Sequence, residues 1–536
     1  MIKSATRFLF NERTLFYGAL LYSIGLLLTL RFYPSMDGAG HLYNSKLIGH
    51  LLNGETPVVN TFFTFNPSII PNWFSHFILS TCQLVMPAWA AEKVLLVIYL
   101  LGITLSFRWL MHELGTGHLS VSVIILPFAY SLLFHLGFYN YCFSFAFLFL
   151  TLAYWLRTRG DHSVSKISIL LLLLTVTYFT AVLAFAFTGL CLGLLVIAWA
   201  IKDYSEGSSI SVVKKKTLRE MWVLLVASLP GIILATLFIL NTRFSTEPGR
   251  IPSEELVTWL NDVRCLIVYE YKKEGNLTIQ FLHLLIAILA IALFNRFRFA
   301  NPESKGLRKF HPGDIFLIPL IVTLVLYFKT PNDAVAGMMS DRYCLQSYFL
   351  FILWVCAQPI PSRLGTFFAV LIVWVHVSLL HMKHEGALKV LNKDASTLAE
   401  ASKILDANSV VLPVNMTDNW LQIHFSNYLG LEKPLVVLEN YEATVGWFPV
   451  RWNEEQLPRV SLGDLERLPN LEWPTNRGSS NSIQIDYVCL YGNIANINDE
   501  QWAELKRVLD KNYLRIYVST NHYIAIYKKY SPKVES

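Results

Sequence analysis

Charged side chains are scarce in this chain of 536 residues: Asp, Glu, Lys and Arg make up 15% of it, against about a quarter in an ordinary globular protein. The hydrophobic fraction is 54%, which excludes a string of soluble domains. Because the apolar residues gather in runs of about 20, the length that crosses a bilayer, the sequence predicts a polytopic α-helical membrane protein. The net charge of +6 is small for this length and gives no indication of nucleic-acid binding.

Motifs of several soluble enzyme classes are also absent. The chain has no P-loop, no H-E-x-x-H, no G-x-S-x-G and no complete G-x-G-x-x-G, which disfavours ATP-driven transport and serine or zinc hydrolysis. The seven cysteines include no C-x-x-C pair, so no zinc site is indicated. Cys265 and Cys489 are both predicted outside the membrane, where they could pair or stay free. Few charged residues lie near the middle of the apolar runs. A transporter for a glycan lipid, which would need polar residues at that depth, is therefore the least favoured function.

Apolar runs of membrane-crossing length recur as far as residue 382. They predict about eleven spans, near 15–33, 91–110, 119–138, 140–156, 167–182, 184–201, 220–240, 279–295, 313–329, 343–359 and 364–382. A further apolar stretch, 68–88, decides the topology, because every short basic loop falls inside only if that stretch does not cross. The stretch also carries Asn72, His76 and Gln83, which are poor lipid-facing residues, so we expect an interfacial or partly buried helix.

This topology predicts a protein of the cytoplasmic (inner) membrane, with a cytoplasmic N-terminus and an extracytoplasmic C-terminal domain. The transmembrane domain covers 1–382 and includes two outer juxtamembrane helices, near 37–53 and 68–88. The tail, 383–536, alternates strand-like runs with helix candidates and predicts a mixed α/β domain. The expected strands are Ser409–Val414, Leu435–Glu439, Ile483–Leu490, Leu514–Ser519 and Tyr523–Tyr527, and the expected helices are 395–407, 418–429 and 498–511.

The most informative segment follows the first span and begins at Asp37. Asp37 suits a helix N-cap, and Asp37, His41 and Asn44 are spaced by four and three residues, which places them on one helix face. Ionisable residues at a membrane boundary indicate function by default. The alternative is that Asp37 only caps the helix and that His41 only faces solvent.

This architecture resembles the GT-C glycosyltransferases, membrane enzymes that use polyprenyl-phosphate-linked sugars. The likeness rests on one span followed by a long outer loop with Asp37 at its start, on the Pro-containing segment from Asn66 to His76, and on Asp341-Arg342-Tyr343 at the start of a late span. In that family the first-loop acidic residue is catalytic or binds metal. Here Gly38, not a second acidic residue, follows Asp37, and the Trp-Trp-Asp run of oligosaccharyltransferases is absent.

The resemblance implies glycosyl transfer from a lipid phosphate, with the polyprenyl-phosphate sugar as donor substrate and a divalent metal as a possible cofactor. Asp37 would be the catalytic base, with His41 beside it. Asn44, Asn72 and His76 would line the substrate cleft. The departing phosphate would be bound by basic residues, and the candidates are Arg264, Lys329 and Arg342, together with Arg243.

A non-catalytic function is the alternative. The protein would then be a membrane scaffold, including an inactive GT-C descendant, whose C-terminal domain docks another protein. In the tail, the segments Asn440-Tyr441-Glu442 and Trp447–Trp452 suit carbohydrate contact or, more simply, the edge of a core. Membrane lipid is the expected partner in either case.

Overall fold

The computed structural model describes residues 11–54, 56–115, 119–242, 249–298, 311–334, 336–456 and 485–530. The chain divides into two compact units. The membrane unit comprises Met1–Leu27, Val97–His135 and Tyr139–Glu385. The second unit, here called the site unit, comprises Leu28–Leu96, Leu136–Phe138 and Gly386–Ser536. The boundaries fall inside helices, so some elements begin in one unit and end in the other.

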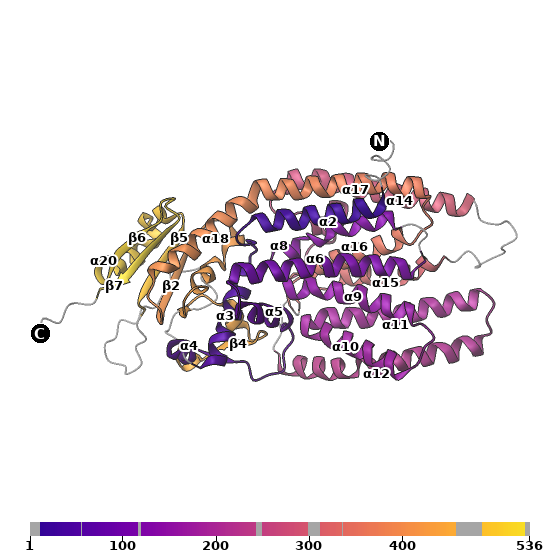
Figure 1. Cartoon of the computed structure of the whole chain (residues 1–536), viewed down its shortest axis with the longest axis horizontal. Coiled ribbons are helices and arrows are strands. Elements are labelled where there is room, and N and C mark those ends of the chain that lie inside the picture. Colours follow the sequence, from indigo (N-terminus) through magenta and orange to yellow (C-terminus); the bar gives the residue numbers. More distant parts are fainter. Residues whose placement is uncertain are drawn as a thin grey trace, which may run out of the picture. The chain divides into compact units, whose positions relative to one another are not determined.

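Within the described ranges, seven helical segments are long and apolar enough to cross a membrane, which makes this a helical membrane protein. They are α6 (Ala88–Glu113), α9 (Tyr139–Arg157), α11 (Val182–Ser205), α12 (Ile210–Asn241), α14 (Tyr271–Arg298), the segment Pro312–Lys329 made of η4 (Pro312–Phe316) and α15 (Leu317–Lys329), and the continuous run Ser362–Ile404 that begins with α17 (Ser362–Lys383). In Figure 1, α9, α11 and α12 run side by side. Each of these three helices contains a stretch of uncharged, mostly apolar residues that is long enough to cross the hydrocarbon core of a membrane.

Three more predicted spans are helical but shorter or less apolar: α2 (Glu12–Thr29), α10 (Val164–Thr180) and α16 (Met339–Cys356). The apolar run 119–138 is not one helix, since it divides into η1 (Ser120–Ile124), α7 (Ile125–Ala129) and α8 (Leu132–His135). α7 ends at Ala129, because Tyr130 with φ −103° and ψ 44° leaves the helical region, and Gly137 turns the chain after α8 with a φ of 83°. About eleven spans therefore remains a prediction.

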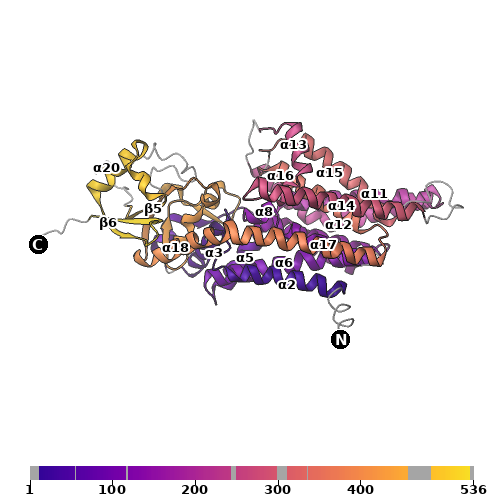
Figure 2. The ribbon, with the colours of Figure 1, turned by 90° about the horizontal axis from the view of Figure 1, so that it is seen from above.

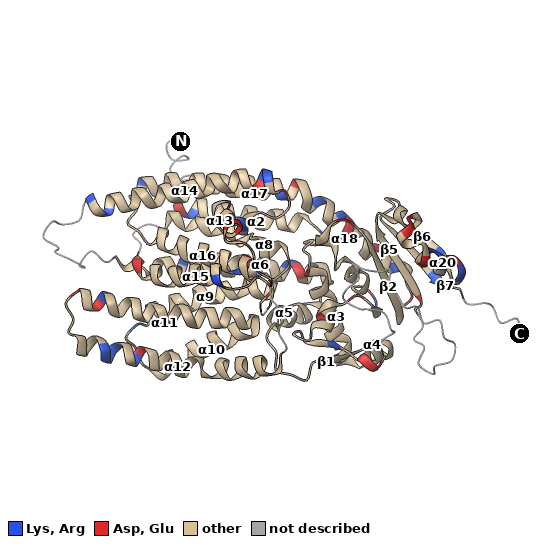
Figure 3. Cartoon of the chain, turned by 180° about the vertical axis from the view of Figure 1, so that it is seen from behind, with Lys and Arg blue, Asp and Glu red and all other residues tan. Residues whose placement is uncertain are grey.

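Charged side chains in the membrane unit gather at helix ends, as Figure 3 shows for α11 and α12. Asp203 accepts from Arg159 at 3.0 Å and from Lys216 at 2.6 Å, and Lys166 lies 3.2 Å from Glu220. These pairs leave the helix bodies between them apolar. The short helix α13 (Ser253–Asn261) lies near α16, which packs along α15 (Figure 2).

The site unit contains a five-stranded sheet in the order β3-β2-β5-β7-β6. Its strands are β2 (Ser409–Met416), β3 (Leu435–Val437), β5 (Tyr487–Gly492), β6 (Tyr513–Val518) and β7 (Ile524–Lys529). β2 pairs in parallel with β3 and β5, whereas β7 is antiparallel to β5 and β6. All five predicted strands are confirmed within a few residues. Alternation of β-branched residues with turn signals was enough to find them.

The segment Leu28–Leu96 and the tail belong to this same compact unit, although the sequence assigned them to different domains. β1 (Phe63–Phe65) pairs antiparallel with β4 (Val450–Trp452). The helices of this first segment that lie wholly in the unit are α3 (Gly38–Asn53), α4 (Pro57–Phe62) and α5 (Phe74–Gln83). α5 is shorter than the predicted helix at 68–88. Pro71 and Asn72, whose φ of 64° is left-handed, prevent the residues before α5 from joining the helix.

The tail helices complete the site unit. They are α18 (Lys389–Ala401), α19 (Tyr441–Val445) and α20 (Ala503–Asn512), with 3-10 turns at η6 (Ser402–Ile404), η7 (Trp420–Gln422), η8 (Phe425–Gly430), η9 (Glu454–Gln456), η11 (Ile494–Asn498) and η12 (Glu500–Trp502), and a π turn, η5 (His384–Leu388), lies between α17 and α18. In the membrane unit, η2 (Arg264–Leu266) follows α13. All seven cysteines are free thiols, so Cys265 and Cys489 do not pair.

Candidate functional site

Helix α3 positions three of the predicted site residues. The helix begins as expected after Asp37, whose carbonyl accepts the first helical bond from His41 N at 3.0 Å. The Asp37 side chain makes no capping hydrogen bond, so its carboxylate is not occupied by the helix end. Asp37, His41 and Asn44 are all buried, at 7%, 3% and 0% exposure. The simple alternative of a solvated His41 is therefore excluded.

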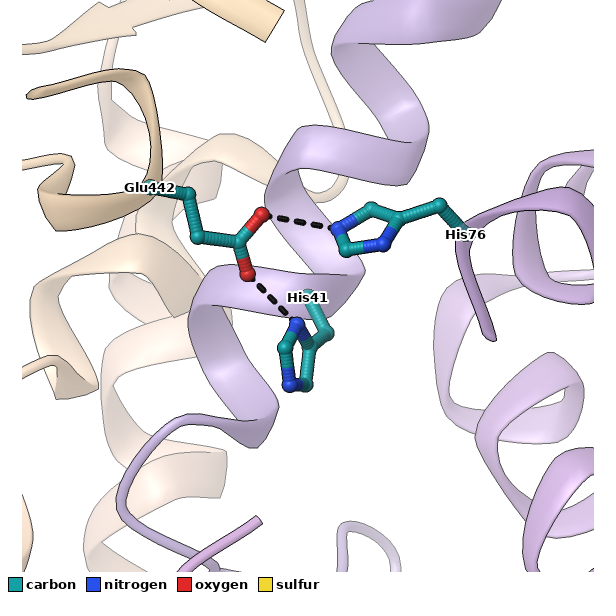
Figure 4. A group of neighbouring side chains, drawn as sticks. All are labelled: His41, His76 and Glu442. Carbon is teal, nitrogen blue, oxygen red and sulfur yellow. Dashed lines mark hydrogen bonds and ion pairs between the residues drawn. The ribbon is translucent and has the colours of Figure 1, made fainter. Parts of the chain in front are cut away.

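A buried triad of His41, His76 and Glu442 forms the centre of the site (Figure 4). One carboxylate oxygen of Glu442 lies 2.5 Å from Nδ1 of His41, and the other lies 2.7 Å from Nε2 of His76. The three side chains come from α3, α5 and α19. A carboxylate buried this deeply is stable only when it is paired and hydrogen-bonded, and here it has a histidine on each oxygen.

The outer nitrogens of both histidines face main-chain carbonyl groups. Nε2 of His41 lies 2.9 Å from the Gly137 carbonyl oxygen, and Nδ1 of His76 lies 3.1 Å from that of Asn72. Gly137 can turn its carbonyl this way because its φ of 83° is open to glycine. A Cβ at residue 137 would come within 2.8 Å of the backbone nitrogen of Gly38. This glycine is thus required by both its dihedral and its surroundings.

A second histidine–carboxylate pair lies beside Asp37. Nδ1 of His424 is 2.8 Å from Glu439, and its Nε2 is 3.9 Å from the Asp37 carboxylate. Glu439 also accepts from the Ser426 hydroxyl and the Asn427 amide, which fixes its position. The ring of Tyr441 stacks on His424 with centroids 4.2 Å apart. His424 is therefore oriented by a carboxylate on one nitrogen and directed to Asp37 by the other, an arrangement typical of acid–base sites.

The electrostatics of the cluster separate its two carboxylates, Asp37 and Glu442. Burial raises the pKa of Asp37, and the nearby His424 and His41 offset only part of that rise. Burial would also raise the pKa of Glu442, but His76 and His41 more than offset it and lower the pKa to about 2. For His41 and His424 burial lowers the pKa, while Glu442 and Glu439 respectively raise it above the ordinary value. Carboxylates with pKa values driven apart are typical of acid–base chemistry.

An amide pair holds α19 against α3. The side-chain amides of Asn44 and Asn440 exchange hydrogen bonds of 3.0 and 2.9 Å. Asn440 also caps α19 by accepting from Ala443 N at 3.1 Å. This double role fixes the turn that carries Glu442. Asn44 thus positions the triad, and its predicted contact with a substrate stays a prediction.

The structure brings together some of the predicted site residues and not others. Asp37, His41, Asn44 and His76 lie in one cluster, and Asn72 contributes its carbonyl to His76 while its amide donates to Trp447 O at 3.4 Å. The predicted phosphate ligands belong to the membrane unit. Arg243 lies outside the described residues.

The three described phosphate candidates differ in their surroundings. Arg342 is buried, with its guanidinium 4.4 Å from the Tyr141 ring centroid, and lines a cavity of about 120 Å³. Arg264 donates to the Ile267 carbonyl at 2.7 Å and lies over Trp259. Lys329 is exposed at the end of α15. Of these, Arg342 has the built environment that an anion site needs.

Sequence reasoning missed His424 and Glu439, and it gave the segment of Glu442 only carbohydrate contact or the edge of a core. A signal was present: Glu439 to Glu442 directly follow the buried parallel strand β3. Ligands of open α/β sheets bind at the carboxyl ends of parallel strands. Polar residues at that place are therefore candidate site residues.

The triad could hold a metal ion, because the ligand atoms of His41, His76 and Glu442 lie within 4.8 Å of one another. Asp37 could act as a base and His424 as its charge partner. No protein-family model matches the chain, and the comparison with curated proteins likewise found no match.

Proposed function

We propose that this protein is an integral-membrane glycosyltransferase that moves a sugar from a polyprenyl-phosphate carrier to a lipid, glycan or protein acceptor, with Asp37 as the catalytic base. The observation that carries the proposal is the buried Asp37 carboxylate, which makes no cap and whose pKa is raised by burial. A base is most effective when its pKa approaches the working pH. The orientation predicted from the basic loops puts this chemistry on the outer side of the cytoplasmic membrane.

The chemistry that we propose is an inverting displacement. Asp37 takes the proton of the acceptor hydroxyl as that oxygen bonds to the anomeric carbon, and the bond from that carbon to the carrier phosphate breaks. The lipid phosphate leaves with the electron pair. The nearby imidazolium of His424 stabilises Asp37 as a carboxylate before the transfer.

Two features of the membrane unit support a lipid-phosphate donor. A cavity of about 300 Å³ is lined mostly by apolar side chains, including Leu282, Ile286, Leu324 and Phe351, which suits an isoprenoid chain. The separate cavity at Arg342 presents a guanidinium, whose planar fork matches phosphate oxygens. The expected loss on replacing Arg342 is therefore in the binding of the phosphate group.

The test compares Asp37→Asn with the wild-type protein in lipid nanodiscs supplied with a panel of polyprenyl-phosphate sugars. Release of sugar from the carrier is measured in the presence of membrane-extract acceptors. We expect Asp37→Asn to lower the rate by about 10²–10⁴-fold, the usual contribution of a general base, with unchanged expression. Asp418→Asn, at an exposed position of the same unit, is the matched control. Wild-type rates in Asp37→Asn would remove Asp37 from the reaction.

A scaffold function is the second candidate, and one observation favours it. Among the described strands β6 is at the edge of the sheet, and its Leu514 and Ile516 are 61% and 38% exposed. An exposed apolar edge strand can pair with another chain. Absence of turnover by the wild type with every carrier, together with a partner captured through β6, would favour this function.

A further inference from the structure

We propose that His41, His76 and Glu442 form a binding site for a divalent transition-metal cation of the zinc class. The proposal goes beyond the glycosyl transfer proposed above, because it concerns binding and does not depend on turnover. It rests on the position of the donor atoms, on the partners of the outer nitrogens and on the chemistry of the donor set.

The donor atoms already point at one place. Nδ1 of His41 and Nε2 of His76 both face the Glu442 carboxylate, and the three ligand atoms lie within 4.8 Å of one another. Around tetrahedral zinc, ligand atoms at about 2.0–2.1 Å from the metal are about 3.3 Å apart. The present separations of 2.5 and 2.7 Å would have to widen by less than about 1 Å. The two ligand nitrogens, which lie within 4.8 Å of each other, would have to approach by up to about 1.5 Å.

The outer nitrogens have the partners that metal-binding histidines usually have. A ligating histidine donates its other ring N–H to a carbonyl or carboxylate, which fixes the tautomer and aims the free lone pair at the metal. His41 has the Gly137 carbonyl in this place, and His76 has that of Asn72. The two rings present different nitrogens inward, Nδ1 and Nε2, and both outer partners are main-chain groups that lose no proton. A purely structural ion pair has no need of this arrangement on both rings.

The donor set selects the class of cation. Two imidazole nitrogens and one carboxylate suit zinc and its first-row neighbours, whereas Mg²⁺ and Ca²⁺ prefer oxygen ligands. Three protein ligands also leave a coordination position for water or another ligand, as in catalytic zinc sites. Within the described residues this is the only such three-ligand group.

His424 provides the internal comparison for the experiment. It is also buried, but its Nδ1 faces the Glu439 carboxylate and its Nε2 is directed at Asp37, and it does not belong to the three-ligand group of His41, His76 and Glu442. A variant at this position perturbs the same unit without removing a proposed ligand. His50, farther along α3, is a second control that leaves the cluster untouched.

The experiment uses the full chain, purified in detergent, stripped with EDTA and dialysed against buffered Zn²⁺. We expect about one zinc per chain by elemental analysis, and a Co²⁺-loaded sample with the visible absorption of a four-coordinate site. His76→Ala and Glu442→Gln should weaken zinc binding at least ten-fold, while His424→Gln and His50→Ala retain it. Zinc should raise the melting temperature of the wild type and of both controls, but not that of the ligand variants.

The melting temperature of each variant in EDTA separates loss of the site from loss of the fold. If His76→Ala does not fold, Glu442→Gln and His41→Asn carry the test. Wild-type protein that takes up no more zinc than folded Glu442→Gln overturns the proposal, as does equal loss in His424→Gln. Zinc binding without glycosyl transfer would keep this site and reject the proposed function. Transfer by a wild-type protein that takes up no zinc would keep the proposed function and reject this site.

Discussion

Buried charges are handled differently in the two units. In the membrane unit Arg296 makes two bonds of 2.9 and 2.6 Å to Asp314, so a cation that keeps its proton pairs with a carboxylate. In the site unit the buried carboxylates Asp37, Glu439 and Glu442 meet histidines instead. A guanidinium does not give up its proton in a protein, whereas an imidazole does so near neutral pH. The first arrangement can only hold structure, and the second can change its charge.

The largest expected effect on stability comes from breaking the ion pair of Arg296 and Asp314. Asp314→Asn leaves Arg296, whose side chain is 14% exposed, without its counter-charge. We expect the free energy of unfolding to fall by about 3 kcal/mol, the lower end of the range for buried pairs that lose one partner. Thermal unfolding in detergent, followed by circular dichroism, measures it. Glu206→Gln, which removes an exposed pair with Lys202, is the control and should change stability by less than about 0.5 kcal/mol. Equal stability of Asp314→Asn and the wild type would contradict the difference between the two units described above.

A smaller loss is expected when the shared carboxylate of the site unit is neutralised. In EDTA, Glu442→Gln should cost about 1.5–3 kcal/mol, the value of hydrogen bonds to a charged group. The loss is limited because one histidine can release a proton and accept from the new amide nitrogen, while the other still donates to the amide oxygen. The same unfolding assay applies, with Glu432→Gln as the exposed control. A loss of stability larger than that of Asp314→Asn would show that the triad, like the pair of Arg296 and Asp314, only stabilises the fold.

The smallest effect is a pH dependence at His424. Because its folded-state pKa is raised, by Glu439 and then by Asp37 and Glu442 against the effect of burial, the folded state binds its proton more tightly than the unfolded state does. The resulting stability is present below about pH 6.5, the unfolded value, and is lost as the pH rises through the folded value. The difference in melting temperature between the wild type and His424→Gln should therefore shrink between pH 6 and 9. A difference that is constant with pH would contradict it.

Local patterns were readable in the sequence. The spacing of Asp37, His41 and Asn44 predicts one helix face because α-helical geometry is fixed within a turn, and α3 has that face buried. The positive-inside test kept 68–88 out of the set of spans, which left His76 available to the site. The strands of the tail were found from composition and alternation, which are likewise local.

Partners distant in sequence were not readable. Glu442 lies 366 positions beyond His76, and no periodicity connects them. Their meeting depends on β1 pairing with β4 and on the Asn44–Asn440 amide pair, which are properties of the packed unit. The break of 119–138 into short helices was missed because the run is apolar throughout, and hydropathy does not register the backbone change at Tyr130 or the turn at Gly137.

The pairing of β1 with β4 also determines when the site can exist during synthesis. The two strands are separated by almost four hundred residues of chain, most of which form membrane helices. At about 5–20 residues per second, His41 and His76 are made well before Glu442 leaves the ribosome. Every chain that stops before Glu442 therefore lacks the triad, however well its helices have inserted. Completion of this one cluster reports that synthesis has passed the membrane helices and that the two ends of the site unit have met.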